Sequence, residues 1–312
     1  MNLFRKLDEF PESLRGGALT IGNFDGVHRG HSTIISELKK HATELNSAAI
    51  VFTFDPHPVR ILRPEQTPPP LTWTRRKADL LAGQGVDVVI AYPTNRELLE
   101  LGPQEFFEKI IVQQIGARAM VEGPNFFFGK DRMGNVDTLA QLCGENEIKL
   151  SVVTPLQDSG DYVSSSRIRR LVSEGDVKTA REFLTEPYRI RGMVTHGSAR
   201  GGSIGFPTAN LDAIDTLIPS NGVYAGRALI ESRWHWAAMN IGPNPTFGEL
   251  LPKVEVHVLD FDGNLYGKPL EVDFIEKLRD IRQFNSAEQL IEQIDIDIKQ
   301  TRRIAREFSV SP

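Results

Sequence analysis

Short apolar runs alternate with segments of helical periodicity through the first half of the chain. Residues 48–54 (AAIVFTF) form the clearest run, and such an uninterrupted apolar stretch is typical of a strand buried on both faces of a parallel sheet. Strand and helix in this rhythm predict an α/β domain with a doubly wound parallel sheet. The other expected strands cover residues 18–21, 87–91, 117–121 and 148–153, and the expected helices cover residues 32–46, 74–84, 103–114 and 137–147.

The turn at residues 22–31 (GNFDGVHRGH) joins the first of these strands to the next helix. In open α/β sheets ligands bind at this edge, and a helix N-terminus favours phosphate. His28 and His31 are three residues apart, which places both rings on one helix face, and Gly30 permits a close approach. A lone H-x-G-H is about as often a pair of surface histidines, but the preceding strand and the Gly-x-Phe-Asp sequence favour a binding site. The other candidate binding residues of the turn are Gly22, Phe24 and Asp25.

This turn resembles the HxGH signature of the class I nucleotidyltransferase superfamily. In its fuller form, GNFDGVHRGH, it resembles the N-terminal module of the prokaryotic bifunctional riboflavin kinase/FAD synthetase (FMN adenylyltransferase) family. The resemblance implies a Rossmann-like nucleotidyltransferase domain that uses ATP. It also implies that His28 and His31 are catalytic, stabilising charge on the phosphates during adenylyl transfer.

Two later segments follow other expected strands and therefore belong at the same sheet edge. His57 lies between two prolines in TFDPHP (53–58), where a structural turn histidine is the alternative. Residues 122–134 (EGPNFFFGKDRMG) match the family pattern G-x-N/D-F-x-F-G-x-x-R-x-G. Three successive aromatic residues more often belong to a core, but beside Asn125 and Arg132 they can stack on a ring system and hold phosphate. We expect His57, Asn125 and Arg132 to bind ATP or flavin.

Ser164, Ser165 and Ser166 precede Arg167 at the start of another helix. Serines in this position are usually N-caps, which explains one of the three. Three hydroxyls and an arginine at a helix N-terminus also form an anion clamp. In the superfamily the similar motif I-S-S-T-x-I-R grips the ATP phosphates, so the resemblance makes the serines ATP-binding residues and Arg167 catalytic. Ser166 stands where Thr is common, which keeps the hydroxyl.

The chain changes character after a helical segment at residues 170–184 and the break at 185–187, so we predict domains at residues 1–185 and 186–312. Several short strands follow, and Asp262-Gly263 is a hairpin signal. This pattern predicts a small antiparallel β-barrel followed by a C-terminal helix. The expected strands cover residues 188–196, 222–230, 234–241, 253–259 and 270–276, and the helix covers residues 286–308.

Residues 197–210 (GSARGGSIGFPTAN) resemble the riboflavin kinase signature G-F/I-P-T-A-N. A glycine-rich loop alone is weak support, but Thr208 and Asn210 offer two oxygen-bearing side chains that can hold Mg²⁺ beside ATP phosphates. Relatives usually carry Arg or Lys at the position of Gly202, and Arg200 is a possible source of that charge. The candidate ATP- or flavin-binding residues here are Gly197, Gly205, Pro207, Thr208 and Asn210.

Glu255 lies in the alternating stretch VEVHV (254–258), which puts it on the opposite face of a strand from its valine neighbours. A solvated surface carboxylate is the alternative interpretation. In the kinase family the corresponding glutamate is the catalytic base, and the match implies that Glu255 accepts the proton of the attacking hydroxyl.

The combined resemblance implies two reactions: ATP-dependent phosphorylation of riboflavin to FMN, then adenylylation of FMN to FAD with release of pyrophosphate. An adenylyltransferase for another phosphorylated acceptor is one alternative. A flavin-binding regulatory protein with degenerate sites is another. The kinase-like second half argues against the first, and the intact motifs argue against the second.

Composition limits the partners. The charge balance of 36 basic and 41 acidic residues gives −5, which exerts no general attraction on nucleic acid or acidic membranes. The single cysteine, Cys143, excludes an internal disulfide and a cysteine-rich metal site. The sequence shows no signal peptide and no long apolar run, so we expect a cytoplasmic protein whose partners are riboflavin, FMN and ATP. The oligomeric state is not predicted.

Overall fold

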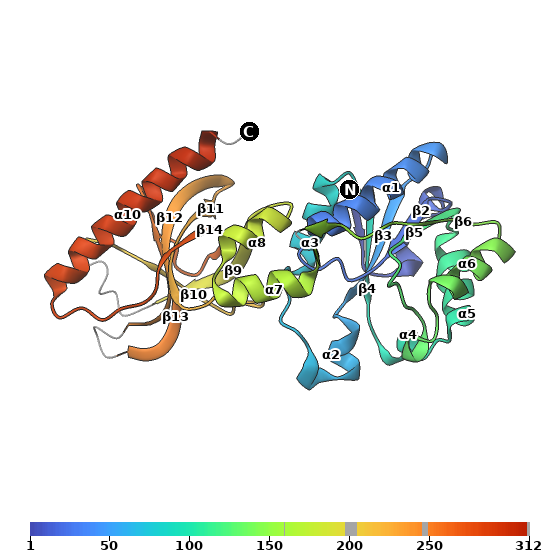
Figure 1. Cartoon of the computed structure of the whole chain (residues 1–312), viewed down its shortest axis with the longest axis horizontal. Helices are drawn as coiled ribbons and strands as arrows, with labels where there is room; N and C mark the ends of the chain where they lie inside the picture. The colour runs from blue at the N-terminus through green and yellow to red at the C-terminus, as the bar shows by residue number, and fades with distance from the viewer. Residues whose placement is uncertain (159, 197–204, 245–248, 311–312) are drawn as a thin grey trace. The chain divides into compact units, whose positions relative to one another are not determined.

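A computed structural model describes residues 1–158, 160–196, 205–244 and 249–310 (Figure 1). The chain divides into two compact units. The first unit comprises Met1–Pro69 and Trp73–Ser165, and the second comprises Pro70–Thr72 and Ser166–Pro312.

The first unit contains a parallel sheet in the order β1-β4-β3-β2-β5-β6. This confirms the predicted fold class. The short edge strand β1 was not expected, because its three residues form no buried apolar run. The strands are β1 (Asn2–Phe4), β2 (Ala18–Ile21), β3 (Ala49–Asp55), β4 (Val88–Pro93), β5 (Ala119–Glu122) and β6 (Lys149–Val152). The helices are α1 (Arg29–Glu44), α2 (Pro58–Leu62), α3 (Thr74–Gly83), α4 (Arg96–Leu99), α5 (Pro103–Phe106), a π-helical segment (Phe107–Ile115) and α6 (Val136–Glu145). Short 3-10 turns lie at Leu7–Glu9, Glu12–Leu14, Pro64–Gln66 and Lys130–Arg132, and β7 (Gln157–Asp158) pairs with β8 (Asp161–Tyr162).

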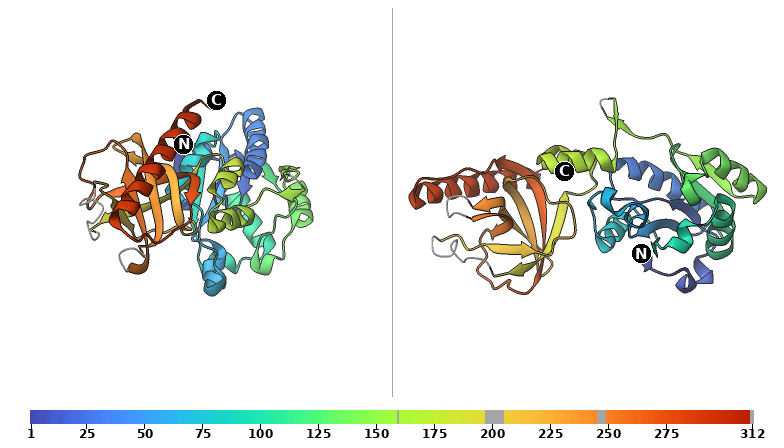
Figure 2. Two further views of the ribbon diagram at one scale, coloured as in Figure 1. Left: turned by 60° about the vertical axis from the view of Figure 1, so that its left-hand side comes forward. Right: turned by 90° about the horizontal axis from the view of Figure 1, so that it is seen from below.

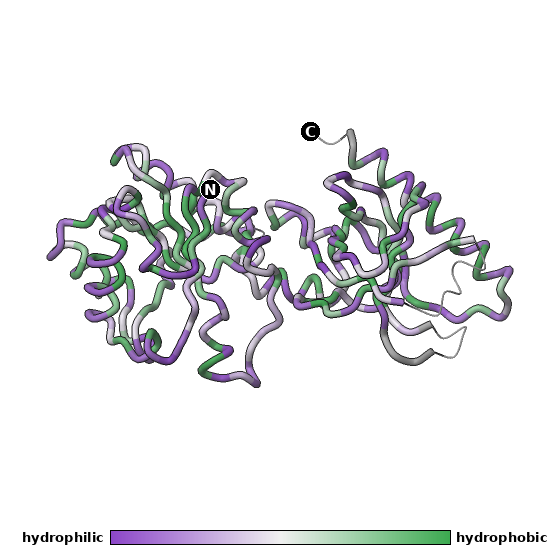
Figure 3. The backbone as a smooth tube through the Cα atoms, turned by 180° about the vertical axis from the view of Figure 1, so that it is seen from behind, coloured by the Kyte–Doolittle hydropathy of each residue, from purple (hydrophilic) through white to green (hydrophobic). Residues whose placement is uncertain are grey.

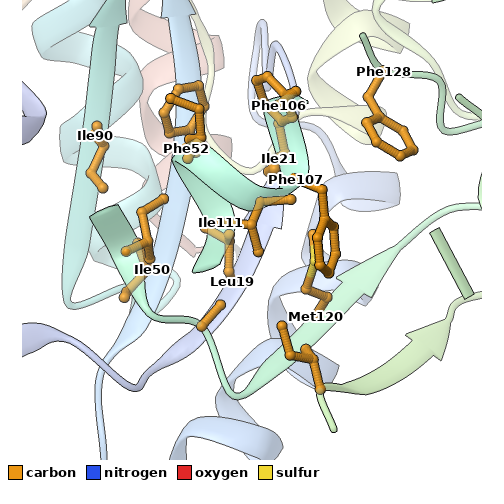
Figure 4. Close-up of a cluster of buried hydrophobic side chains, with 14 of the residues drawn as sticks. Leu19, Ile21, Ile50, Phe52, Ile90, Phe106, Phe107, Ile111, Met120 and Phe128 are labelled. Atoms are coloured by element: carbon orange, nitrogen blue, oxygen red, sulfur yellow. The ribbon is translucent and has the colours of Figure 1, made fainter. Parts of the chain in front are cut away.

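Apolar side chains fill both faces of this sheet. Ile50 and Phe52 of β3 point to one face, where they join a cluster with Phe107 of the π-helical segment (Figure 4). Val51, between them, points to the other face and joins a cluster with Leu38 of α1. Because successive strand residues alternate between faces, a continuous apolar run is what a sheet covered on both sides requires. The carboxyl end of β2 then leads directly into the turn before α1.

The second unit is built around a closed antiparallel barrel (Figure 2). Its strand order is β10-β13-β12-β11-β14-β9. The barrel and the C-terminal helix confirm the prediction for the second half. The strands are β9 (Tyr188–Thr195), β10 (Ala209–Asp212), β11 (Gly222–Ile230), β12 (Arg233–Asn244), β13 (Glu249–Val258) and β14 (Pro269–Arg279). The helices are α7 (Ser165–Glu174), whose first residue belongs to the first unit, α8 (Val177–Phe183) and α10 (Ala287–Val310).

Helix α10 contacts β11 and β12. Hydrophilic and hydrophobic residues alternate along it, as Figure 3 shows. Ile304 joins a small apolar cluster with Ala225 and Ile275, and Asp297 forms an ion pair with Arg279 at 2.8 Å. Within the residues described, no helix has both the length and the apolar character needed to cross a membrane.

Two local expectations were wrong. Asp262-Gly263 does not close a hairpin, because β13 pairs with β10 and β12, whereas β14 pairs with β11 and β9. The helix expected at residues 170–184 is interrupted: Gly175 adopts φ +85°, which ends α7, and the Asp176 side chain accepts the Thr179 N–H at 3.0 Å to begin α8.

The second compact unit begins before the predicted domain boundary at residues 185/186. Helix α8 contacts β14 and β9, and Lys178 pairs with Glu276 at 3.0 Å. At Gly175 an added Cβ would lie 2.3 Å from the Ser220 hydroxyl, so the helix junction lies tightly against the barrel. Both helices are therefore grouped with the barrel by their contacts, whereas the boundary between the two activities stays a prediction.

Candidate functional site

The two histidines of the 22–31 turn stack on each other. His28 is the N-cap of α1, and His31 is the third residue inside it. Their ring centroids are 3.6 Å apart with an interplanar angle of 17°, and the ring of Phe24 lies 4.9 Å from that of His31. The predicted placement of both rings on one helix face is thus observed, at the N-terminal end of a sixteen-residue helix.

One hydrogen bond determines which ring nitrogen of a neutral His31 carries the proton. The backbone N–H of His28 donates to Nδ1 of His31 at 3.3 Å, so a neutral His31 carries its proton on Nε2. Burial, followed by the charges of His28 and Lys77, lowers the pKa of His31 well below its usual value. His31 therefore remains neutral near pH 7 and offers Nε2–H as a hydrogen-bond donor beside the positive end of the α1 dipole.

Backbone geometry around Gly30 leaves no space for a side chain. An added Cβ would lie 2.9 Å from the Val163 carbonyl oxygen and 3.1 Å from the His28 ring. The turn itself is strained, since Phe24 and Val27 have φ of 46° and 41°. The close approach expected at Gly30 is thus made by the chain itself, between α1 and the segment that leads to the serines.

The serine segment is joined to the turn by a direct contact. The Ser165 hydroxyl donates to the backbone carbonyl of Asp25 at 2.8 Å. Ser164 is half-buried and Ser166 is exposed. Arg167 is grouped with the second unit, where its guanidinium lies 4.2 Å from the centroid of the Phe183 ring.

His57 has a structural contact that fits the alternative interpretation. Its Nδ1 accepts the Val59 backbone N–H at 3.1 Å and so caps the short helix α2. One ring nitrogen, Nδ1, is thus engaged within the turn.

The three successive aromatic residues at 126–128 differ in their surroundings. Phe126 and Phe128 stack on each other, with centroids 5.5 Å apart, and belong to the core or pack against it. Phe127 is 45% exposed, and the Arg132 guanidinium lies 4.4 Å from its centroid. Asn125 is exposed next to them. Of the three aromatics, only Phe127 presents a large surface to an incoming ring system.

Polar side chains form a row on the outer wall of the barrel. Asn210 of β10 lies directly opposite Glu255 of β13, which lies opposite Asn240 of β12. The Asn240 amide donates to the Glu255 carboxylate at 3.4 Å. Val254 and Val256 are buried while Glu255 is half-buried, so the predicted alternation along β13 is observed.

The segment before β10 places the other kinase candidates at one end of this row. Thr208 lies two residues before Asn210 and is half-buried. The His257 ring nitrogen Nδ1 donates to the Pro207 carbonyl at 2.8 Å, which ties the segment to β13. Gly205 has φ +91°, a conformation suited to glycine. Gly197, Arg200 and Gly202 lie outside the described residues.

Comparison with known proteins gives a different family match for each half of the chain. Residues 10–167 match the FAD synthetase family and residues 184–305 match the riboflavin kinase family. The bifunctional riboflavin kinase/FMN adenylyltransferase of Pseudomonas fluorescens is 36% identical over 307 residues, which covers 98% of each chain. The Escherichia coli K12 protein of the same description is 32% identical over 310 residues, covering 99% of this chain and 98% of that one.

The chain belongs to the bifunctional riboflavin kinase/FMN adenylyltransferase family. Its activities are therefore riboflavin phosphorylation and FMN adenylylation, as the sequence predicted. A crystal structure described as a macrolide-efflux protein from Streptococcus pneumoniae is also similar, with a TM-score of 0.83 and 28% identity, covering 96% of this chain and 98% of that one.

Three residues near these two clusters were not assigned a role from the sequence. Lys77 of α3 is 9% exposed, and its charge is one of the causes that lower the pKa of His31. Glu122 ends β5 and is 3% exposed. Asn240 contacts the predicted kinase base. For Lys77 the sequence signal is its position in the apolar stripe of α3, three residues before the buried Leu80 and four before the buried Leu81.

Proposed function

We propose that the two activities use the two clusters separately: the stacked histidines serve FMN adenylylation, and the polar row on the barrel serves riboflavin phosphorylation. The observation that supports this division is that His28 and His31 are assembled within the first compact unit, whereas Asn210, Glu255 and Asn240 are assembled within the second. Accordingly, we assign residues 1–185 to adenylylation and residues 186–312 to the kinase.

In the adenylyl transfer, a phosphate oxygen of FMN attacks the α-phosphorus of ATP. The bond from that phosphorus to the bridging oxygen of the β-phosphoryl group breaks, and pyrophosphate leaves. The nucleophile is already an anion, so the site needs donors for the developing charge and no strong base. His31 Nε2–H, His28 and the N-terminus of α1 supply those donors.

Other residues bind the substrates of this reaction. Ser164, Ser165, Ser166 and Arg167 are assigned to the ATP phosphates on the strength of their motif. Gly22, Phe24, Asp25 and Gly30 shape the turn. His57, Asn125 and Arg132 are assigned to nucleotide or flavin binding, and the exposed Phe127 beside Arg132 is suited to stacking on a flavin ring.

In the kinase reaction, a riboflavin hydroxyl attacks the γ-phosphorus of ATP, and ADP leaves with the bridging oxygen. Glu255 takes the hydroxyl proton, and its contact with Asn240 orients the carboxylate. Mg²⁺ prefers oxygen ligands, and the Thr208 hydroxyl and Asn210 amide oxygens, two residues apart, fit that preference together with ATP phosphates. When bound, the ion neutralises charge on the transferred phosphoryl group. Gly205, Pro207 and Gly197 are assigned to the loop that covers the phosphates.

The proposed partners are small molecules: riboflavin, FMN, FAD and ATP. The net charge of −5 gives no general affinity for nucleic acid. We place the enzyme in the cytoplasm, where ATP is available to both reactions.

Two variants of the full chain test the division. We expect His31→Ala to lower FMN adenylylation by roughly 10²–10³-fold, since it removes a donor to the developing charge, and to leave riboflavin phosphorylation unchanged. We expect Glu255→Gln to lower phosphorylation by about 10²-fold or more and to leave adenylylation unchanged. Each reaction is measured alone, by resolving FMN formed from riboflavin and FAD formed from FMN, both with Mg-ATP.

His235→Ala and Glu292→Gln, which alter residues of the second unit outside both clusters, are the matched controls. Equal loss of both activities in His31→Ala, or in Glu255→Gln, would contradict the assignment of separate sites.

A further inference from the structure

Lys77 is a charged residue in an apolar position. Helix α3 buries Ala78 and Leu81 against the sheet, and Lys77 lies on the same stripe with only 9% of its surface exposed. Taking an ammonium group out of water is unfavourable, so a buried lysine needs a compensating gain in stability or in function.

Its amino group lies at the carboxyl edge of the sheet. Lys77 Nζ donates to the Thr53 hydroxyl at 3.3 Å, and the Thr53 hydroxyl donates to the backbone carbonyl of Asn23 at 3.1 Å. Thr53 belongs to the last part of β3, and Asn23 belongs to the turn that carries the stacked histidines. This chain of contacts places the ammonium directly beside that turn.

The charge of Lys77 also acts on His31 electrostatically. Together with burial and His28, it lowers the pKa of His31. A neutral histidine donates a hydrogen bond but brings no net charge, whereas the triphosphate of ATP carries several negative charges. A nearby ammonium therefore supplies an attraction for phosphate that neutral His31 does not supply.

We propose that Lys77 is a phosphate-binding residue of the adenylylation site, contacting the β- and γ-phosphates of ATP and the pyrophosphate that leaves. This inference rests on the proposed use of the histidine turn for adenylyl transfer. Negative charge accumulates on the departing pyrophosphate as the bond to the α-phosphorus breaks, so a fixed ammonium there stabilises the transition state more than the bound substrate.

The test compares Lys77→Met, Lys77→Arg and the control Lys109→Met, which alters an exposed lysine of the first unit. Lys77→Met keeps the length of the side chain but removes the charge. We expect it to lower kcat/KM for ATP in FMN adenylylation by roughly 10²-fold and to weaken product inhibition by pyrophosphate. Lys77→Arg keeps the charge and should retain part of the activity. Riboflavin phosphorylation should not change.

Thermal unfolding separates this role from a structural one. Because Lys77→Met removes a buried charge, the variant should melt at the same temperature as the parent protein or a higher one. A lower melting temperature together with lost adenylylation would overturn the proposal, and so would unchanged adenylylation.

His31→Ala, measured in parallel, distinguishes failure of this inference from failure of the site. If His31→Ala abolishes adenylylation while Lys77→Met does not affect it, only the role of Lys77 is wrong. If neither substitution affects adenylylation, the histidine turn is not the site.

Discussion

The pKa values of two titratable side chains, the buried Glu122 and the half-buried His31, shift in opposite directions from their usual values. The Glu122 carboxylate oxygen Oε1 accepts the backbone N–H of Ile21 at 2.7 Å. Burial raises the pKa of Glu122 well above its usual value, against the opposing effect of this hydrogen bond. Glu122 thus anchors the end of β2, the strand that leads into the histidine turn.

The raised pKa of Glu122 predicts a pH-dependent stability. A carboxyl group whose pKa is higher in the folded than in the unfolded state stabilises the fold below its unfolded pKa, and that stabilisation is lost as the pH rises through the folded pKa. Glu122→Gln keeps the acceptor for the Ile21 N–H and removes the ionisation. We therefore expect the free energy of unfolding of the variant, relative to the parent protein, to increase with pH above about 4.3.

Urea unfolding at a series of pH values measures this difference. Glu108→Gln, at an exposed position of the same unit, is the control and should show no such trend. A constant difference between Glu122→Gln and the parent protein across the pH range would contradict the argument.

The sequence predicted contacts between residues that lie only a few positions apart along the chain. The stacking of His28 and His31 follows from a separation of three residues at a helix start. The position of Lys77 depends on Thr53, twenty-four residues earlier on a neighbouring strand, and no local pattern reports that contact. The core positions of Phe126 and Phe128 depend in the same way on packing across the unit.

At the scale of elements, the approach of the segment before α7 to the first turn of α1 depends on one glycine. The Val163 carbonyl oxygen and the His28 ring both occupy the space that a side chain on Gly30 would need. Any larger residue must move the segment, the ring or the helix start.

We expect Gly30→Ala to lower FMN adenylylation by up to about 10²-fold, because it displaces His28 or the serine segment from its position. Riboflavin phosphorylation should be unaffected. The matched control is Gly144→Ala in α6, where an added Cβ meets nothing within 4 Å. That substitution should raise stability by about 0.5 kcal/mol and leave both activities intact. Normal adenylylation in Gly30→Ala would show that the close approach is not needed.

Strong periodicity made most elements predictable. The apolar runs of the parallel sheet and the longer barrel strands were anticipated, because their side chains alone define buried faces. Strand β10 was not, because its four residues follow a glycine-rich sequence that is typical of a loop. The hairpin predicted from Asp262-Gly263 was wrong, because a turn sequence does not specify which strands pair in a closed barrel.

At the scale of the whole molecule, the second compact unit includes helices that the sequence assigned to the first domain. Val177 and Phe183 of α8 are buried, and α8 contacts β14 and β9. The change from helical periodicity to short strand patterns in the sequence predicts where the barrel begins. It does not predict which of the preceding helices pack against the barrel.

Two fragments test this organisation. We expect a fragment that begins at residue 166 to unfold at a temperature roughly 5–10 °C higher than one that begins at residue 186, because the shorter fragment exposes the barrel surface that α8 covers. Differential scanning calorimetry of both fragments measures the difference. Identical melting temperatures would show that α7 and α8 add nothing to the stability of the barrel.

The closed ring of strands constrains how the kinase half can vary. Asn210, Glu255 and Asn240 lie side by side only while their three strands keep one register. Inserting or deleting a single residue in β13 that shifts the register at Glu255 would turn this carboxylate toward the barrel interior and place a valine between Asn210 and Asn240. A change of chain length at this point of β13 therefore separates the three polar side chains, whereas an exchange of residue type on the same face leaves their positions adjacent.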